Sequence, residues 1–305
     1  MAIESSFDPT RVRIGKEFAR LGIRVILPEF RNSVDGHVFP AALHDCYSTV
    51  VWASKRYDQA VVVSGESGGG NLAIATCLLA KGKKHIRAIK GCYALCPFIC
   101  GSYPSSSFPS IDYYENYLCS ISFLADCARL YTADDDVDAA TSSLAWPSYA
   151  TIEELKGLPP TAVHINELDL LYDEGVQFYR SLLAAGNRGA RMKIVGGTFH
   201  AADTFSGLVE DIAHATRVGI VQFALGCGSD EGHTSGSCDT LRCMRVKRDS
   251  KQHSSRTLSL SSSCSNQRLS FGLGLVIGGA AGYFASGLVF ESLFPGFIAR
   301  SINGK

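Results

Sequence analysis

The feature that most limits how this chain can fold is an alternation before residue 226 between short apolar runs and longer amphipathic segments. Continuous runs rich in β-branched residues are typical of strands that are buried on both faces. We expect strands at residues 23–27, 60–64, 89–95, 161–165 and 191–195. We expect helices at residues 11–21, 40–55, 71–81 and 174–185. This order predicts an α/β fold, with a mostly parallel sheet covered by helices on both faces.

The composition changes sharply near residue 226, which predicts a domain of residues 1–226. Residues 227–270 are rich in serine and basic residues, so we expect a disordered linker. Residues 271–290 carry no charge, and a run of about 20 apolar residues is long enough for a transmembrane helix. Six glycines weaken this interpretation, and a glycine-rich tail is the alternative. Residues 291–305 would form a tail.

Charge and cysteine content bound the partners and the compartment. The 305 residues include 29 basic and 29 acidic side chains, which gives no indication of a nucleic-acid partner. The 11 cysteines are an odd number and no secretory signal is present, so we expect free thiols in a reduced, intracellular protein. Cys92, Cys96 and Cys100 lack the spacing of a metal site, and we expect no metal and no cofactor. A C-terminal membrane anchor would leave the main domain in the cytosol.

A glycine-rich turn follows the apolar run at residues 60–64 and carries the strongest chemical signal. The sequence Gly65-Glu66-Ser67-Gly68-Gly69 lies between a predicted strand and a predicted helix. A sharp turn of this kind presents a serine hydroxyl above the sheet as a nucleophile. We expect Ser67 to be that nucleophile and the backbone N–H of Gly68 to be one oxyanion donor.

A serine nucleophile needs a base, and the base needs an acid. Among eight histidines, His200 alone follows the last predicted strand in a loop, and we expect it to be the base. His164 lies within a strand, which is typical of a core histidine. The acid is expected after the strand at residues 161–165. The loop position favours Asp169. Four carboxylates compete there: Asp169, Asp173, Glu167 and Glu174.

Several motifs occur in the order found in one family. They are the segment Gly65-Glu66-Ser67-Gly68-Gly69-Gly70-Asn71-Leu72-Ala73, the segment Phe39-Pro40-Ala41-Ala42-Leu43-His44-Asp45, the tripeptide Leu158-Pro159-Pro160, and Asp169–Gly175. The chain resembles the hormone-sensitive-lipase-like esterases of the α/β-hydrolases over about residues 10–225. The resemblance implies that Asp169 is the acid and His200 the base. It implies a serine carboxylesterase that forms an acyl-enzyme from small to medium acyl esters.

One family motif has no counterpart in the chain. The H-G-G-G oxyanion motif would fall before Met1, so the family pattern is N-terminally truncated here. In the family, the strand that carries this motif lies between the strands matching residues 23–27 and 60–64. Its loss would leave strand edges unpaired or force a new pairing. The alternatives are therefore an incomplete gene model, an impaired enzyme, and a member of the fold that only binds a ligand. Aromatic residues between Cys100 and Trp146 are expected to pack the core, and some of them to line an acyl pocket.

Overall fold

A computed structural model of the chain describes residues 9–103, 109–115, 117–133, 137–204, 207–227 and 274–278. These residues belong to one compact unit of the chain. The strands are β1 Arg24–Ile26, β2 Val61–Glu66, β3 Ile89–Leu95, β4 Thr161–Leu168, β5 Arg191–Phe199 and β6 Gly274–Gly278. The longer helices are α1 Pro9–Arg20, α2 Ala41–Tyr57, α3 Gly68–Gly82, α5 Ile121–Thr132, α8 Tyr172–Ala184 and α9 Glu210–Gly226. Shorter helices are η1 Ser33–Asp35, η2 Ile86–Ala88, α4 Ser110–Tyr114, α6 Val137–Ala140, η3 Pro147–Tyr149, α7 Ile152–Leu155 and η4 Ala202–Thr204.

The strands form a single sheet in the order β1-β6-β2-β3-β4-β5, and each neighbouring pair is parallel. The predicted α/β fold with a mostly parallel sheet is therefore confirmed. Every strand predicted before residue 226 is present, although β2, β4 and β5 extend further than their apolar runs. Because the strands are parallel, their carboxyl ends meet at one edge of the sheet, and residues that follow them lie near one another.

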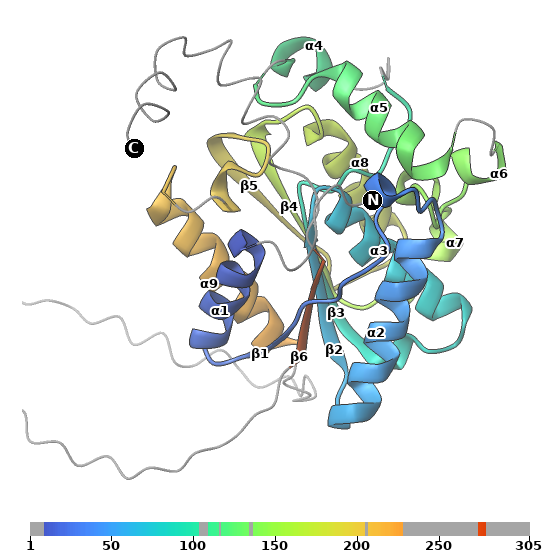
Figure 1. Cartoon of the computed structure of the whole chain (residues 1–305), viewed down its shortest axis with the longest axis vertical. Coiled ribbons are helices and arrows are strands. Elements are labelled where there is room, and N and C mark those ends of the chain that lie inside the picture. Colours follow the sequence, from blue (N-terminus) through green and yellow to red (C-terminus); the bar gives the residue numbers. More distant parts are fainter. Residues whose placement is uncertain are drawn as a thin grey trace, which may run out of the picture. The chain divides into compact units, whose positions relative to one another are not determined.

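Helices cover both faces of this sheet (Figure 1). On one face, α2, α3 and α8 pack against alternate strand residues such as Val61, Val63 and Val163. On the other face, α1 and α9 pack against Val62 and Ala162. The alternation follows from the period of two along a strand, which sends successive side chains to opposite faces. This two-sided burial explains why the strands appear in the sequence as continuous apolar runs.

A further apolar cluster lies beyond the carboxyl edge of the sheet. It joins α5 to Leu170 and Leu171, which directly follow β4. Its centre is formed by Tyr131 and Trp146, whose rings pack edge to face with centroids 5.4 Å apart. The expectation that most aromatic residues of this region serve packing fits these two side chains, which are almost fully buried. Tyr113 is exposed, and residues 104–108 lie outside the described part of the chain.

The segment predicted to be a transmembrane helix is a strand where the structure describes it. Gly274–Gly278 form β6, which pairs with β1 on one side and with β2 on the other. The prediction of a helix is wrong at these residues, because a short apolar run bounded by glycines suits a buried strand as well as a helix. Among the described residues, no helix has the length and apolar character to cross a membrane. The predicted linker of residues 227–270 lies outside the described residues except for Cys227, which follows α9, and the predicted tail of residues 291–305 lies wholly outside them.

Candidate active site

Ser67 lies in the turn between β2 and α3, in a backbone conformation that L-residues rarely adopt. Its φ is 57° and its ψ is −119°. Two backbone hydrogen bonds hold the turn against the end of β3. The Ser67 N–H donates to the carbonyl of Leu95 at 2.9 Å, and the Phe98 N–H donates to the carbonyl of Ser67 at 3.1 Å. Strained residues persist only where the surrounding structure fixes them, and they are concentrated at functional sites. Ser67 is therefore fixed beside the carboxyl ends of β2 and β3.

The glycines after Ser67 allow α3 to begin directly beneath this turn. A Cβ atom at Gly70 would lie 2.9 Å from the Leu95 carbonyl oxygen and 3.0 Å from the Pro97 Cα. Gly68 is the first residue of α3, where backbone N–H groups have no partner within the helix. Asn71, fully buried, donates to the carbonyls of Phe98 and Ala145 and so ties α3 to the loops above the sheet. The geometry is that of a nucleophile turn with a helix N-terminus below it.

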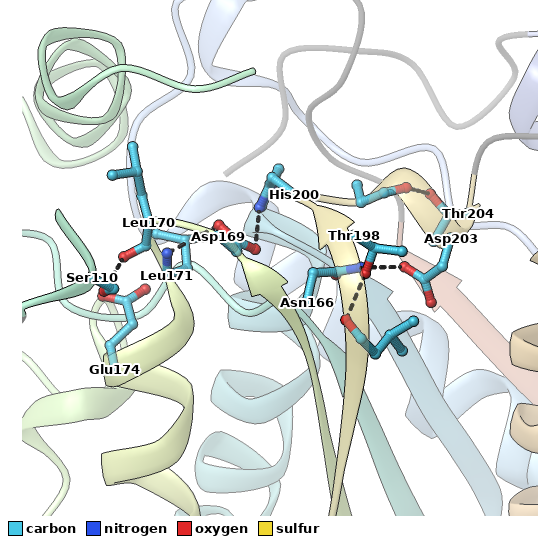
Figure 2. A network of polar contacts seen from close by, with 12 residues as sticks. Ser110, Asn166, Asp169, Leu170, Leu171, Glu174, Thr198, His200, Asp203 and Thr204 are labelled. Atoms are coloured by element: carbon cyan, nitrogen blue, oxygen red, sulfur yellow. Dashed lines mark hydrogen bonds and ion pairs between the residues drawn. The ribbon is translucent and has the colours of Figure 1, made fainter. Parts of the chain in front are cut away.

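His200 and Asp169 form a buried pair at the same edge of the sheet (Figure 2). His200 follows β5 and Asp169 follows β4, and the Nδ1 of His200 lies 2.8 Å from Oδ2 of Asp169. The other oxygen of Asp169 accepts a hydrogen bond from the Leu171 N–H at 3.0 Å. When Nδ1 keeps its proton and donates a hydrogen bond to Asp169, the lone pair of the neutral ring is on Nε2, the nitrogen that can act as a base.

The hydroxyl of Ser67 is not hydrogen-bonded to His200 among the contacts of the described residues. The structure thus brings together two of the three residues predicted for catalysis, and it holds the third at the same edge of the sheet. Catalytic hydrogen bonds are often long in enzymes without substrate, so the geometry is compatible with a catalytic role.

The three competing carboxylates have other partners. Asp173 accepts a hydrogen bond from the Ser110 N–H at 2.7 Å. Glu167 accepts one from the Gly197 N–H at 2.7 Å and is largely exposed. Glu174 is buried and accepts hydrogen bonds from the Ile99 N–H at 3.0 Å and the Tyr103 hydroxyl at 2.7 Å. Each of them stabilises a loop next to the sheet, which leaves Asp169 as the carboxylate that contacts His200.

Burial and charge shift the pKa values of these groups. Burial lowers the pKa of His200, but the charge and hydrogen bond of Asp169 outweigh it and the net shift is upward, well above the ordinary value. Burial also raises the pKa of Glu174 to about 8, and the nearby charge of Asp169 adds to the shift. The imidazole of His200 is therefore a stronger base than a histidine in water.

A second buried His–Asp pair lies next to the first and was not predicted from the sequence. The Nε2 of His164, on β4, lies 2.8 Å from Oδ2 of Asp203, which follows His200 by three residues. Asp203 also accepts hydrogen bonds from Asn166 at 2.9 Å and Thr216 at 2.7 Å. Burial raises the pKa of Asp203, but the hydrogen bond and charge of His164 lower it further, so the net shift is downward. This network fixes the loop that carries His200, and its contact between Asn166 and Asp203 is seen in Figure 2.

Cys96, expected only to pack the core, lies against the Asp169–His200 pair. One ligand atom each of Cys96, Asp169 and His200 lies within 4.8 Å of the others. Such side chains bind zinc in other proteins. Burial raises the pKa of Cys96 to about 12, so its thiol is protonated at neutral pH. Asp169 and His200 are already engaged with each other, and we assign no metal to this site.

Three features define the class of α/β-hydrolases: a parallel sheet, a serine in the turn after β2, and an Asp–His pair formed by residues that follow β4 and β5. A family profile described as alpha/beta hydrolase fold matches residues 6–204. The chain belongs to this family. The predicted resemblance to hormone-sensitive-lipase-like esterases is confirmed, since the chain is similar to a solved structure described as brefeldin A esterase, a bacterial homologue of human hormone sensitive lipase. The two are 35% identical with a TM-score of 0.70, over 74% of this chain and 66% of the other.

Two further relatives are also described as esterases. The solved structure of esterase Est22 is 35% identical with a TM-score of 0.68, over 73% of this chain and 68% of that chain. The carboxylic ester hydrolase LipN of Mycobacterium tuberculosis is 30% identical over 190 residues, which are 58% of this chain and 48% of LipN. The chain thus spans about half the length of this curated relative.

Proposed function

We propose that the protein is a serine carboxylic-ester hydrolase that acts on small to medium acyl esters. The observation that carries the proposal is the Asp169–His200 pair at the same sheet edge as the strained turn of Ser67. The esterases among the relatives support the reaction class. Small-molecule esters are therefore the proposed substrates, and the chemistry requires no metal or cofactor.

In the proposed reaction, Nε2 of His200 accepts the proton of the Ser67 hydroxyl as the oxygen attacks the ester carbonyl carbon. Asp169 keeps the proton on Nδ1 and stabilises the imidazolium that forms. The backbone N–H of Gly68 donates to the developing oxyanion. His200 then protonates the leaving alcohol, and an acyl-enzyme on Ser67 remains. Water, deprotonated by His200, attacks the acyl carbon and releases the carboxylic acid and the free serine.

A second candidate is a catalytically impaired or ligand-binding member of the same fold. One observation favours it, namely that no Ser67–His200 hydrogen bond occurs among the contacts of the described residues. The localisation in a reduced, intracellular compartment is proposed from the cysteine content alone, and no membrane anchor is part of this proposal.

The test is labelling of the full chain by a fluorophosphonate probe. Ser67→Ala should abolish labelling. The matched control Ser181→Ala changes a half-buried serine of α8 whose hydroxyl donates to the Gln177 carbonyl, and it should be labelled like the parent. Hydrolysis of p-nitrophenyl acyl esters of increasing chain length would then define the acyl preference. A parent chain that folds but is not labelled would favour the impaired or ligand-binding alternative.

A further inference from the structure

The position of β6 in the sheet has consequences beyond the fold. Its five residues lie between β1 and β2, with Val25 and Val62 both in register with Leu275. Among the described strands, β1 pairs only with β6, and β6 covers the edge of β2 that does not face β3. The first strand of the chain is thus joined to the rest of the sheet through a segment from the opposite end of the sequence.

The neighbours of β6 form a slot that fits one strand. Adjacent strands lie about 4.8 Å apart, so β1 and β2 are held about two such spacings from each other. Val61, Val62 and Val63 are almost fully buried, and both α2 and α3 contact β6. If β6 were removed, the backbone N–H and C=O groups of β2 that face it would lose their partners inside the molecule. Buried backbone groups without a hydrogen-bond partner are strongly unfavourable.

The slot ends next to Ser67. Gly65, two residues before Ser67, is in register with Gly278, the last residue of β6. The turn of Ser67 is fixed on its other side by Leu95 and Phe98, which lie at or beyond the end of β3. The nucleophile turn is therefore supported by β3 on one side and by β6 on the other.

We infer that the slot between β1 and β2 is a docking site for an extended apolar segment, and that the chain fills it with its own residues 274–278. The segment acts as a tethered ligand rather than as a membrane anchor. Residues 228–273 connect it to α9 within one chain, and the entropy cost of closing a loop grows only slowly with its length. Docking also supports the turn of Ser67, a part of the inference that rests on the proposed function.

The test uses the full chain with a protease recognition site placed within residues 229–271. After cleavage, size exclusion should show the fragment that contains residues 274–278 eluting with the rest at the mass of one chain. The variant Val276→Pro should release this fragment, because proline within a strand that is paired on both sides removes an N–H group and clashes with its neighbour. The control Ser262→Pro, in the cleaved connection, should leave the fragments together.

If Val276→Pro does not fold, a second experiment tests the docking, in which a synthetic peptide competes with the fragment for the slot between β1 and β2. Excess synthetic peptide of residues 272–280 should displace the fragment from the cleaved parent, and the same peptide with Val276→Pro should not. Separation of the parent fragments without peptide, or co-elution of the Val276→Pro fragments, would overturn the docking. Elution of the parent at the mass of two chains would overturn docking within one chain.

Fluorophosphonate labelling of the same samples separates docking from function. The fragment that contains residues 274–278 is removed from the cleaved parent under mild denaturant, and the remaining protein is returned to buffer without added peptide. Its labelling should then be at least tenfold lower. Labelling should recover when the peptide of residues 272–280 is added. A parent that is never labelled contradicts the proposed function, while co-elution still decides the docking. Full labelling without any bound strand would overturn the support of Ser67 by β6.

Discussion

Two buried histidines, His164 on β4 and His200 directly after β5, each contact an aspartate, and they differ in what the second ring nitrogen contacts. The Nδ1 of His164 lies 2.9 Å from the Tyr93 hydroxyl and its Nε2 contacts Asp203, so both nitrogens are used within the core. The Nδ1 of His200 contacts Asp169, which leaves Nε2 for chemistry. The difference in partners explains why His200 rather than His164 is the candidate base.

Replacement of Asp169 by Asn should reduce kcat by about 10⁴, since the tautomer of His200 would no longer be fixed. It should also change the pH profile. His200 acts as a base only when neutral, so activity rises as pH rises through its pKa. Asp169 raises that pKa, and the acid limb of the residual activity should move to lower pH in the variant. Ester hydrolysis measured from pH 5 to 9 checks both effects.

The control for Asp169→Asn is Asp173→Asn, four residues further along the chain. Asp173 accepts a hydrogen bond from the Ser110 N–H and does not contact His200 among the described contacts. Its replacement should leave the pH limb unchanged and kcat within about threefold. Equal kcat values and equal pH limbs for the two variants would remove Asp169 from the proposed mechanism.

Asp203→Asn should lower the free energy of unfolding at pH 7 by about 3 kcal/mol, the usual cost of breaking a buried ion pair on one side. The net downward shift of the pKa of Asp203 means that its stabilisation is present above the unfolded value of 3.8 and is lost as pH falls below that value. Urea unfolding at pH 7 and pH 3 checks the prediction. An equal difference between parent and variant at both pH values would contradict it.

At the scale of elements, the start of α3 depends on the absence of side chains. Gly70→Ala should destabilise the protein by about 1–3 kcal/mol, because the new Cβ meets the Leu95 carbonyl oxygen at 2.9 Å, a backbone atom that cannot easily move. Gly82→Ala is the matched control at the end of the same helix, where nothing lies within 4 Å. It should leave stability unchanged or raise it by about 0.5–1 kcal/mol. Thermal unfolding of both variants checks the prediction, and equal unfolding midpoints for the two would contradict it.

The five strands before residue 226 and the helices α1, α2, α3 and α8 could be predicted because local pattern determines them. A strand such as β3 is one continuous apolar run, and its predicted limits match the observed ones. The strand β6 could not be predicted, because its partners Val25 and Val62 lie more than 200 residues away in the sequence. A five-residue apolar stretch within a longer uncharged run carries no period that separates strand from helix.

The same distinction applies to the candidate site. Ser67, Asp169 and His200 each follow a strand in an order that indicates their roles, and these assignments remain proposals. The contact between His164 and Asp203 joins a strand to a loop and leaves no local pattern, although the position of Asp203 three residues after His200 was visible. Cys96 had no signal at all, since a thiol in an apolar run looks like any other small core residue.

For the whole molecule, one arginine connects the beginning and the end of the domain. Arg217 on α9 is buried and contacts Glu17 of α1 at 3.1 Å and Glu210 at 2.7 Å. Arg217→Met should lower the free energy of unfolding by about 2 kcal/mol, because the carboxylate of Glu17 would lose its partner. Arg129→Met is the control, as its ion pair with Asp126 is exposed and worth about 0–1 kcal/mol. Equal unfolding midpoints for the two variants in urea would contradict the assignment.

The place of β6 in the sheet also means that β2 is synthesised long before the strand that pairs with it. A ribosome adds about 5–20 residues per second, so roughly 10–40 seconds pass between the emergence of β2 and that of its neighbour β6. During this interval the valine-rich edge of β2 has no strand beside it from its own chain. Nascent chains with such an edge are open to pairing with one another. The tendency of this chain to aggregate should therefore be greatest before its last strand has been made.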